Sequence, residues 1–99
     1  MARFDVYRNP EGPGLLLDCQ ADLLSGLNTR LVVPLLPADA APRPAARLNP
    51  VFTVEEQDVV MVTQYAASVP LDLLRDRVCS LRSDDFTITN AIDMLLSGY

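Results

Sequence analysis

Arg30-Leu31-Val32-Val33-Pro34-Leu35-Leu36 decides the fold, because it has the pattern of a buried β-strand that a proline interrupts. Pro34 has no N–H to donate to a β-ladder, so it marks an edge, a bulge or a bend in that strand. A bent strand suits a small barrel, in which the strands must turn corners. This stretch therefore predicts a curled, mainly β protein.

A hairpin is expected before this strand. Residues 4–7 alternate apolar and polar side chains, and residues 15–20 resume as a second strand. Between them, residues 9–14 contain two prolines and two glycines, which is turn chemistry. Residues 25–28, Ser-Gly-Leu-Asn, are a further turn signal that leads into the central strand.

A second hairpin is expected after it. Residues 51–54 and 59–63 are rich in β-branched side chains and flank the polar residues 55–58. The proline-rich residues 37–47 predict a surface loop that includes a short helical turn near residues 38–41. Residues 67–70 are expected to form a tight connection.

The following residues, 71–81, fit two structures. Residues 73–77 fit a short helical turn, whereas residues 77–81 alternate like a strand.

The end of the chain predicts an α-helix. Ser83 is a suitable N-cap, and Asp84 and Asp85 favour the positive end of a helix dipole. Gly98 stands where a glycine ends a helix. Apolar residues recur at three- and four-residue steps and make one face: Ile88, Ala91, Ile92, Leu95 and Tyr99. Short strands followed by one helix indicate a small barrel or sheet with a helix packed on it.

The composition excludes several classes of function. The net charge is −5, and the chain has no lysine, which argues against a protein that grips nucleic acid by itself. With neither lysine nor histidine, the usual general bases and zinc ligands are missing. The acidic pairs Asp18/Asp22, Glu55/Glu56 and Asp84/Asp85 each have a structural explanation. We expect no enzyme activity, no metal and no cofactor, so function points to binding.

The location of the protein follows by elimination. No secretory signal and no run of about 18 apolar residues is present. Cys19 and Cys79 lie in apolar stretches without metal-binding spacing and predict free, buried thiols in a reducing compartment. We therefore expect a cytoplasmic protein without membrane contact.

Several short pieces of the sequence are specific when their order and spacing are taken together, although no single one is decisive. They are Phe4-Asp5-Val6-Tyr7, Leu17-Asp18-Cys19-Gln20-Ala21-Asp22, Arg30-Leu31-Val32-Val33-Pro34-Leu35, Leu48-Asn49-Pro50-Val51, Ala67-Ser68-Val69-Pro70, Ile88-Thr89-Asn90-Ala91-Ile92-Asp93 and Gly98-Tyr99. In these pieces, across nearly its whole length, the chain resembles the CcdB toxin family.

The resemblance implies a fold and a function. The fold would be a mainly β (α+β) SH3-like small barrel with an appended hairpin and a C-terminal α-helix, as one toxin domain over residues 1–99. The protein would be a homodimer and the toxin of a type II toxin–antitoxin system. It would bind the DNA gyrase A subunit and trap the cleaved DNA complex. A cognate CcdA-like antitoxin would neutralise it and help to repress the operon.

The resemblance also implies two binding sites. The gyrase-binding residues would be Leu23, Leu24, Asp93, Leu96, Ser97, Gly98 and Tyr99. The antitoxin-binding residues would be Arg8, Asn9, Glu11, Ala41 and Arg43. In the family the chain ends in Trp-Gly-Ile, whereas this chain ends in Ser97-Gly98-Tyr99.

Other functions stay open at this point. A tryptophan that stacks on a partner's arginine is worth about 2–4 kcal/mol of binding, so Ser97 also fits a non-toxic CcdB-like protein that binds antitoxin or regulates. A ribonuclease toxin with the same barrel fold is a third possible function, which the lack of histidine and lysine disfavours. Topoisomerase IV is an alternative target. Tyr99 fits either a contact surface or a side chain that closes the core.

Overall fold

The computed structural model describes residues 2–98 of the chain. Within this range it has seven β-strands, four short 3-10 turns and one α-helix. In chain order they are β1 Asp5–Arg8, β2 Leu15–Asp18, η1 Asp22–Leu24, β3 Thr29–Pro37, β4 Val51–Val54, β5 Gln57–Met61, η2 Thr63–Tyr65, β6 Ala67–Pro70, η3 Leu71–Leu73, β7 Arg77–Ser80, η4 Arg82–Asp84 and α1 Asp85–Ser97.

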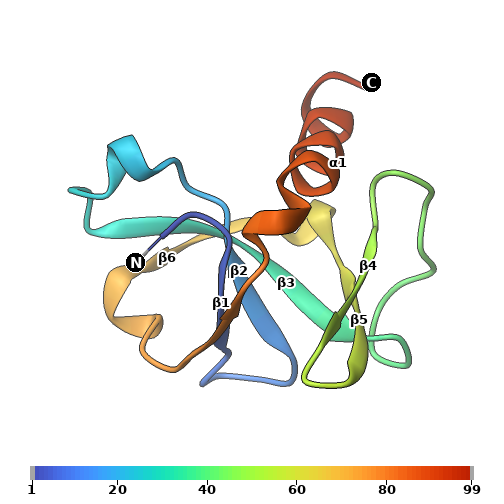
Figure 1. Cartoon of the computed structure of the whole chain (residues 1–99), viewed down its shortest axis with the longest axis horizontal. Coiled ribbons are helices and arrows are strands. Elements are labelled where there is room, and N and C mark those ends of the chain that lie inside the picture. Colours follow the sequence, from blue (N-terminus) through green and yellow to red (C-terminus); the bar gives the residue numbers. More distant parts are fainter. Residues whose placement is uncertain (1, 99) are drawn as a thin grey trace.

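The strands form one antiparallel sheet in the order β4-β5-β3-β2-β1-β7, and β6 also pairs with β3. The nine-residue strand β3 is the centre of the sheet, since β2, β5 and β6 all pair with it. The sheet curls into a half-barrel from which α1 projects (Figure 1). The predicted mainly β fold with a C-terminal helix is confirmed.

Pro34 lies at the point where β3 changes its neighbour. The ladder with β6 ends at Val32, and the ladder with β5 begins at Leu35. The Pro34 carbonyl accepts a hydrogen bond of 3.0 Å from the Val62 N–H, while the missing N–H falls between the two ladders. The proline therefore bends the central strand without removing a ladder bond.

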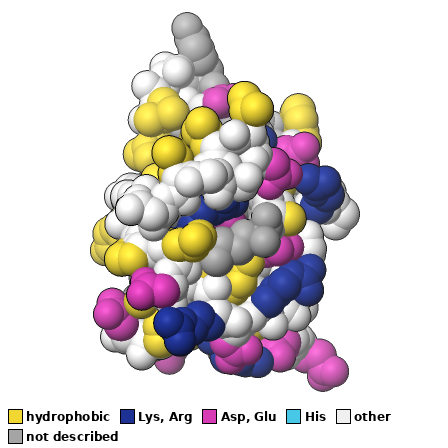
Figure 2. Space-filling model, turned by 90° about the vertical axis from the view of Figure 1, so that its left-hand side faces the viewer, with side chains coloured by type: hydrophobic (Ala, Val, Ile, Leu, Met, Phe, Trp, Pro, Cys, Tyr) yellow, Lys and Arg dark blue, Asp and Glu magenta, His cyan; other side chains and the backbone are white. Residues whose placement is uncertain are grey.

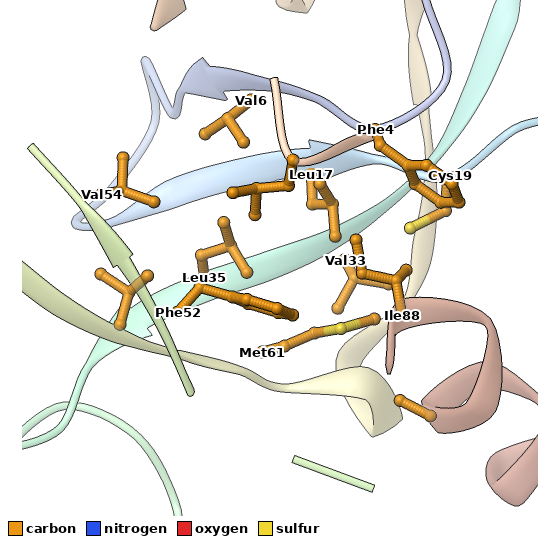
Figure 3. Close-up of a cluster of buried hydrophobic side chains, with 13 residues drawn as sticks. Phe4, Val6, Leu17, Cys19, Val33, Leu35, Phe52, Val54, Met61 and Ile88 are labelled. Atoms are coloured by element: carbon orange, nitrogen blue, oxygen red, sulfur yellow. The ribbon is translucent and has the colours of Figure 1, made fainter. Parts of the chain in front are cut away.

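The main core fills the inside of the half-barrel. Alternate side chains of β2, β3 and β5, such as Leu17, Leu35 and Met61, point toward one another there (Figure 3). Phe52 of β4 and Ile88 of α1 reach the same cluster (Figure 3). Burial of each large apolar side chain stabilises the fold by about 1.5–3 kcal/mol.

Both predicted hairpins are present. β1 pairs with β2, and β4 pairs with β5. The second hairpin turns on two residues, Glu55 and Glu56, whose φ angles are 52° and 65°. Positive φ at both central positions is the type I′ geometry that matches the twist of paired strands, although glycine and asparagine are the usual residues there.

The connecting segments differ in part from expectation. Residues 67–70 were expected to form a connection and instead form β6, because the first half of β3 needs a partner on this edge. Residues 71–81 contain both expected structures, since η3 is a helical turn and β7 is a strand. In the 37–47 loop, the amides of Ala40 and Ala41 donate to the Pro37 carbonyl and make a single turn.

The predicted N-cap is wrong by one residue. Ser83 lies inside η4, where the Asp84 N–H donates to the Leu81 carbonyl at 2.9 Å, so α1 has Asp84 as its N-cap residue and no side-chain cap. The helix ends as predicted. Gly98 has φ 81°, a left-handed conformation that suits glycine, and its N–H donates to the Met94 carbonyl at 3.0 Å.

Only the first half of α1 is buried. Ile88 and Ala91 are fully covered, Ile92 is half-buried, and Leu95 is 41% exposed. The helix packs mainly on η2 and η4, and its second half stands clear of the sheet (Figure 1). With 13 residues, it falls short of the length needed to cross a membrane, and no other helix among the described residues reaches it.

Candidate functional site

Two leucines project from the turn between β2 and β3. Leu23 is 94% exposed and Leu24 is 48% exposed, both on η1. A fully solvated leucine contributes nothing to the core. It leaves its apolar surface exposed to water, which is unfavourable. The turn is also well ordered by hydrogen bonds, so it presents these side chains in a defined geometry.

The side chain of Gln20 holds this turn at three points. Its amide Nε2 donates to the carbonyls of Leu24 and Thr29, each at 3.1 Å. Its Oε1 accepts from the Leu31 N–H at 3.0 Å. One amide group thus joins the turn at Leu24 to the start of β3 at Thr29 and Leu31.

A buried ion pair lies beneath Gln20. The Arg30 Nη2 and the Asp18 Oδ2 are 2.7 Å apart, and the two side chains are 1% and 0% exposed. The Arg30 Nε also donates to both carboxylate oxygens, at 3.0 and 3.2 Å. The Gln20 N–H donates to the Asp18 Oδ1 at 3.1 Å, so the pair fixes the backbone at the start of the loop.

Asp22 connects the same turn to the base of the helix. Its Oδ1 accepts a hydrogen bond from the Arg3 N–H at 2.8 Å, and its Oδ2 pairs with the Arg82 Nη2 at 3.3 Å. These bonds, first the one from Arg3, hold the pKa of the Asp22 carboxyl below its usual value. Because Arg82 opens η4, the leucine turn and α1 share a common support.

The outer face of α1 forms the second exposed element. Leu96 is 75% exposed, and Asp93, Ser97 and Gly98 are exposed as well. In Figure 2, hydrophobic side chains gather in the upper part of the displayed face and charged side chains of both signs crowd its lower part. The exposed end of the helix therefore presents Leu95 and Leu96 beside the polar residues Asp93 and Ser97.

A groove of about 480 Å³ lies on another part of the surface. Arg8 joins two carboxylates there: its Nη2 is 3.0 Å from Glu55 and its Nε is 3.2 Å from Asp76. The Asn9 Oδ1 accepts from the Glu11 N–H at 2.9 Å and shapes the turn beside it. The groove is lined by Arg8, Asn9, Pro10, Asp72, Leu73, Arg75 and Asp76.

The described residues offer little covalent or metal chemistry. Cys19 and Cys79 are free thiols, of which Cys19 is buried and Cys79 half-buried. Burial raises the pKa of Cys19 to about 12, so this thiol is protonated and unreactive at neutral pH. Between residues 2 and 98, no group of three or more potential ligands gathers to hold a metal ion.

A comparison with known families gives one match. The family model described as CcdB protein matches residues 3–98. The chain belongs to the CcdB family. Members of this family are toxins of toxin–antitoxin systems, and an antitoxin is the partner of such a toxin. The match covers both the leucine turn and the C-terminal helix.

The predicted gyrase-binding residues fall into two groups: Leu23 and Leu24 on η1, and Asp93, Leu96, Ser97 and Gly98 at the end of α1. Both groups are exposed, and the Asp22–Arg82 ion pair links their supports at the base of the helix. Tyr99, the last residue of the prediction, lies outside the described residues.

The predicted antitoxin-binding residues are less closely grouped. Arg8 and Asn9 line the 480 Å³ groove, and Glu11 belongs to the adjoining turn. Ala41 and Arg43 do not line this groove. The groove is completed instead by Asp72, Leu73, Arg75 and Asp76, which the sequence did not point to.

Sequence reasoning also missed Gln20 and Phe86 as candidate functional residues. The three hydrogen bonds of the Gln20 side chain depend on a loop shape that no local pattern encodes. Phe86 is 79% exposed, and its spacing to Asp93 and Ser97, i+7 and i+11, puts it on the side of α1 away from Ile88. A helical wheel of residues 85–97 would have found it.

Proposed function

We propose that this chain is a toxin that binds the DNA gyrase A subunit and traps the enzyme on cleaved DNA. It acts in the cytoplasm as a homodimer, and each chain forms one toxin domain over residues 1–99. Its action needs no catalytic step. A cognate antitoxin neutralises it and takes part in control of the operon. The CcdB family membership, with its toxin–antitoxin role, supports this proposal.

The observation that carries the proposal is the 94% exposure of Leu23 on a turn held by hydrogen bonds. An exposed apolar side chain on an ordered element is suited to burial by a partner, because little conformational entropy of the loop is lost on binding. Leu96, which is 75% exposed, adds apolar surface on the helix. The net charge of −5 favours a protein partner over direct binding to DNA.

Binding to purified gyrase A subunit tests the proposal. Leu23→Ser should weaken this binding at least tenfold, since loss of a central apolar contact costs about 2 kcal/mol. Val51→Ser is a matched control, because Val51 is 54% exposed on β4, away from the turn. The control should bind like the unchanged chain.

A cleavage assay gives the second readout. The chain should increase the amount of DNA that gyrase leaves cleaved, and Leu23→Ser should reduce this effect. The proposal fails if the unchanged chain neither binds the A subunit nor stabilises cleaved DNA at micromolar concentration. Binding to the equivalent topoisomerase IV subunit instead would redirect the proposal to that enzyme.

The antitoxin side of the proposal rests on the groove at Arg8. A peptide antitoxin that occupies it would contact Arg8 and Asn9 and would have to compete with Glu55 and Asp76 for the Arg8 guanidinium. Arg8→Ala should therefore weaken antitoxin binding while gyrase binding is unchanged. Equal loss of both activities would contradict two separate sites.

A further inference from the structure

We propose that Gln20 is the positioning residue of the gyrase contact: it sets the conformation of the turn that presents Leu23 and Leu24. This inference rests on the proposed function. Gln20 itself is half-buried and does not need to touch the partner. Its effect on gyrase binding would come from the conformation that it gives to the loop.

All the hydrogen-bonding groups of the Gln20 side chain are used on this loop. The two protons of Nε2 go to the carbonyls of Leu24 and Thr29, and Oε1 accepts from the Leu31 N–H. The Leu24 carbonyl belongs to the turn that carries the exposed leucines. The other two partners, Thr29 and Leu31, belong to β3, so Gln20 connects the exposed turn to a strand of the sheet.

Apart from the Asp22 contacts and a bond of 3.0 Å from the Leu71 N–H to the Asn28 carbonyl, the remaining bonds of the loop are local. Leu24 donates to Ala21, Ser25 donates to Asp22, and Leu27 donates to Leu24, at 2.9–3.1 Å. All of residues 21–29 are exposed, so water competes for each of these bonds. Without Gln20 the loop would be attached to the protein through the Asp22 contacts and its two ends, and Leu23 would sample many positions.

The support below Gln20 explains why this residue can hold the loop. Its N–H donates to Asp18 and its carbonyl accepts from the Arg30 Nη2 at 3.5 Å, so its backbone rests on the buried ion pair. Because the backbone is already fixed there, the three further bonds have to offset only the rotamer entropy of the glutamine side chain, about 1.5–2 kcal/mol. Through Gln20, the buried ion pair thereby helps to fix the positions of the exposed leucines.

A double-mutant cycle against gyrase A subunit tests this. Gln20→Ala should raise Kd about tenfold, since the partner must then order the loop itself. In a Leu23→Ser background the same change should raise Kd less than about twofold, because the contact it positions is already gone. Gln20→Glu keeps the size and the acceptor but lacks the two donors, so it should bind as weakly as Gln20→Ala. Gln57→Ala, an exposed glutamine on the β4–β5 hairpin, is the matched control.

Amide hydrogen exchange gives a readout that needs no partner. In Gln20→Ala the Ser25 and Leu27 amides should exchange faster, while core amides such as Met61 keep their protection. Unchanged exchange at Ser25 and Leu27 would overturn the inference, and so would Kd effects that multiply in the double variant. If the unchanged chain does not bind gyrase A subunit, the proposed function fails, and the exchange experiment still decides whether Gln20 orders the turn.

Discussion

Asp18 and Arg30 form a buried ion pair that joins neighbouring strands at the edge of the exposed loop, with Nη2 and Oδ2 2.7 Å apart. Asp18→Asn should lower the free energy of unfolding by about 3–5 kcal/mol, because it leaves the guanidinium buried without a counter-charge. This is a large share of the 5–15 kcal/mol of a typical small protein. Urea unfolding measures the change.

The double variant Asp18→Leu/Arg30→Met is the control for that prediction. It removes both charges, so it should be more stable than Asp18→Asn. A value for Asp18→Asn within 1 kcal/mol of the unchanged chain would show that water reaches the pair.

Glu56→Gly should stabilise the β4–β5 hairpin by about 0.5–1 kcal/mol. Glu56 has φ 65°, which costs an L-residue about 1–2 kcal/mol and costs glycine almost nothing. Glu55 is left in place because it pairs with Arg8. Thermal unfolding should show a higher Tm for Glu56→Gly and a lower Tm for Gln57→Gly, where the glycine falls within a strand. A Tm that falls in both variants would contradict a strained turn.

The link between the leucine turn and the helix should weaken in acid. The folded pKa of Asp22 is lowered from its ordinary 3.8, mainly by the Arg3 N–H and then by Arg82. A lowered folded pKa means that the contribution is fully present above pH 3.8 and is lost as the pH falls through the lower folded value. An NMR titration should follow the Asp22 carboxyl and the Arg3 amide together. Titration of Asp22 at or above its ordinary value would show that these bonds are not formed.

Ser97→Trp should test the alternative of a non-toxic relative. Ser97 is exposed near the end of α1, so the substitution should change the free energy of unfolding by less than about 0.5 kcal/mol. A ring that stacks on a partner's arginine should tighten gyrase binding about 30- to 1000-fold. Growth arrest by the variant alone would favour the non-toxic reading of the natural chain, and equal toxicity of both would exclude it.

Periodicity predicted the elements whose signal is local. Ile88 and Ala91 have helical spacing, Gly98 ends the helix, and both hairpins follow from alternation and turn residues. β6 was missed because Ala67–Pro70 becomes a strand only through its pairing with β3. Ser83 was misplaced because η4 precedes α1 directly, which no N-cap preference encodes.

The candidate site was predictable in part. Leu23 and Leu24 came from the resemblance, and their exposure agrees with a contact role. The side chains that hold them were not foreseen, since the bonds of Gln20 to Leu24, Thr29 and Leu31 depend on the shape of the loop rather than on a local sequence pattern. A charged residue at each of positions 18 and 30, beside apolar runs, was the available signal for the buried pair.

Because α1 has a buried first half and a projecting second half, its two halves differ in which substitutions they tolerate. Substitutions beyond Ile92 alter surface that the fold does not depend on, whereas those at Ile88 or Ala91 remove packing from the centre. Selection can therefore alter the exposed end to bind a different or altered target with little loss of folding stability. The helix separates the part of the molecule that must stay constant from the part that is free to adapt.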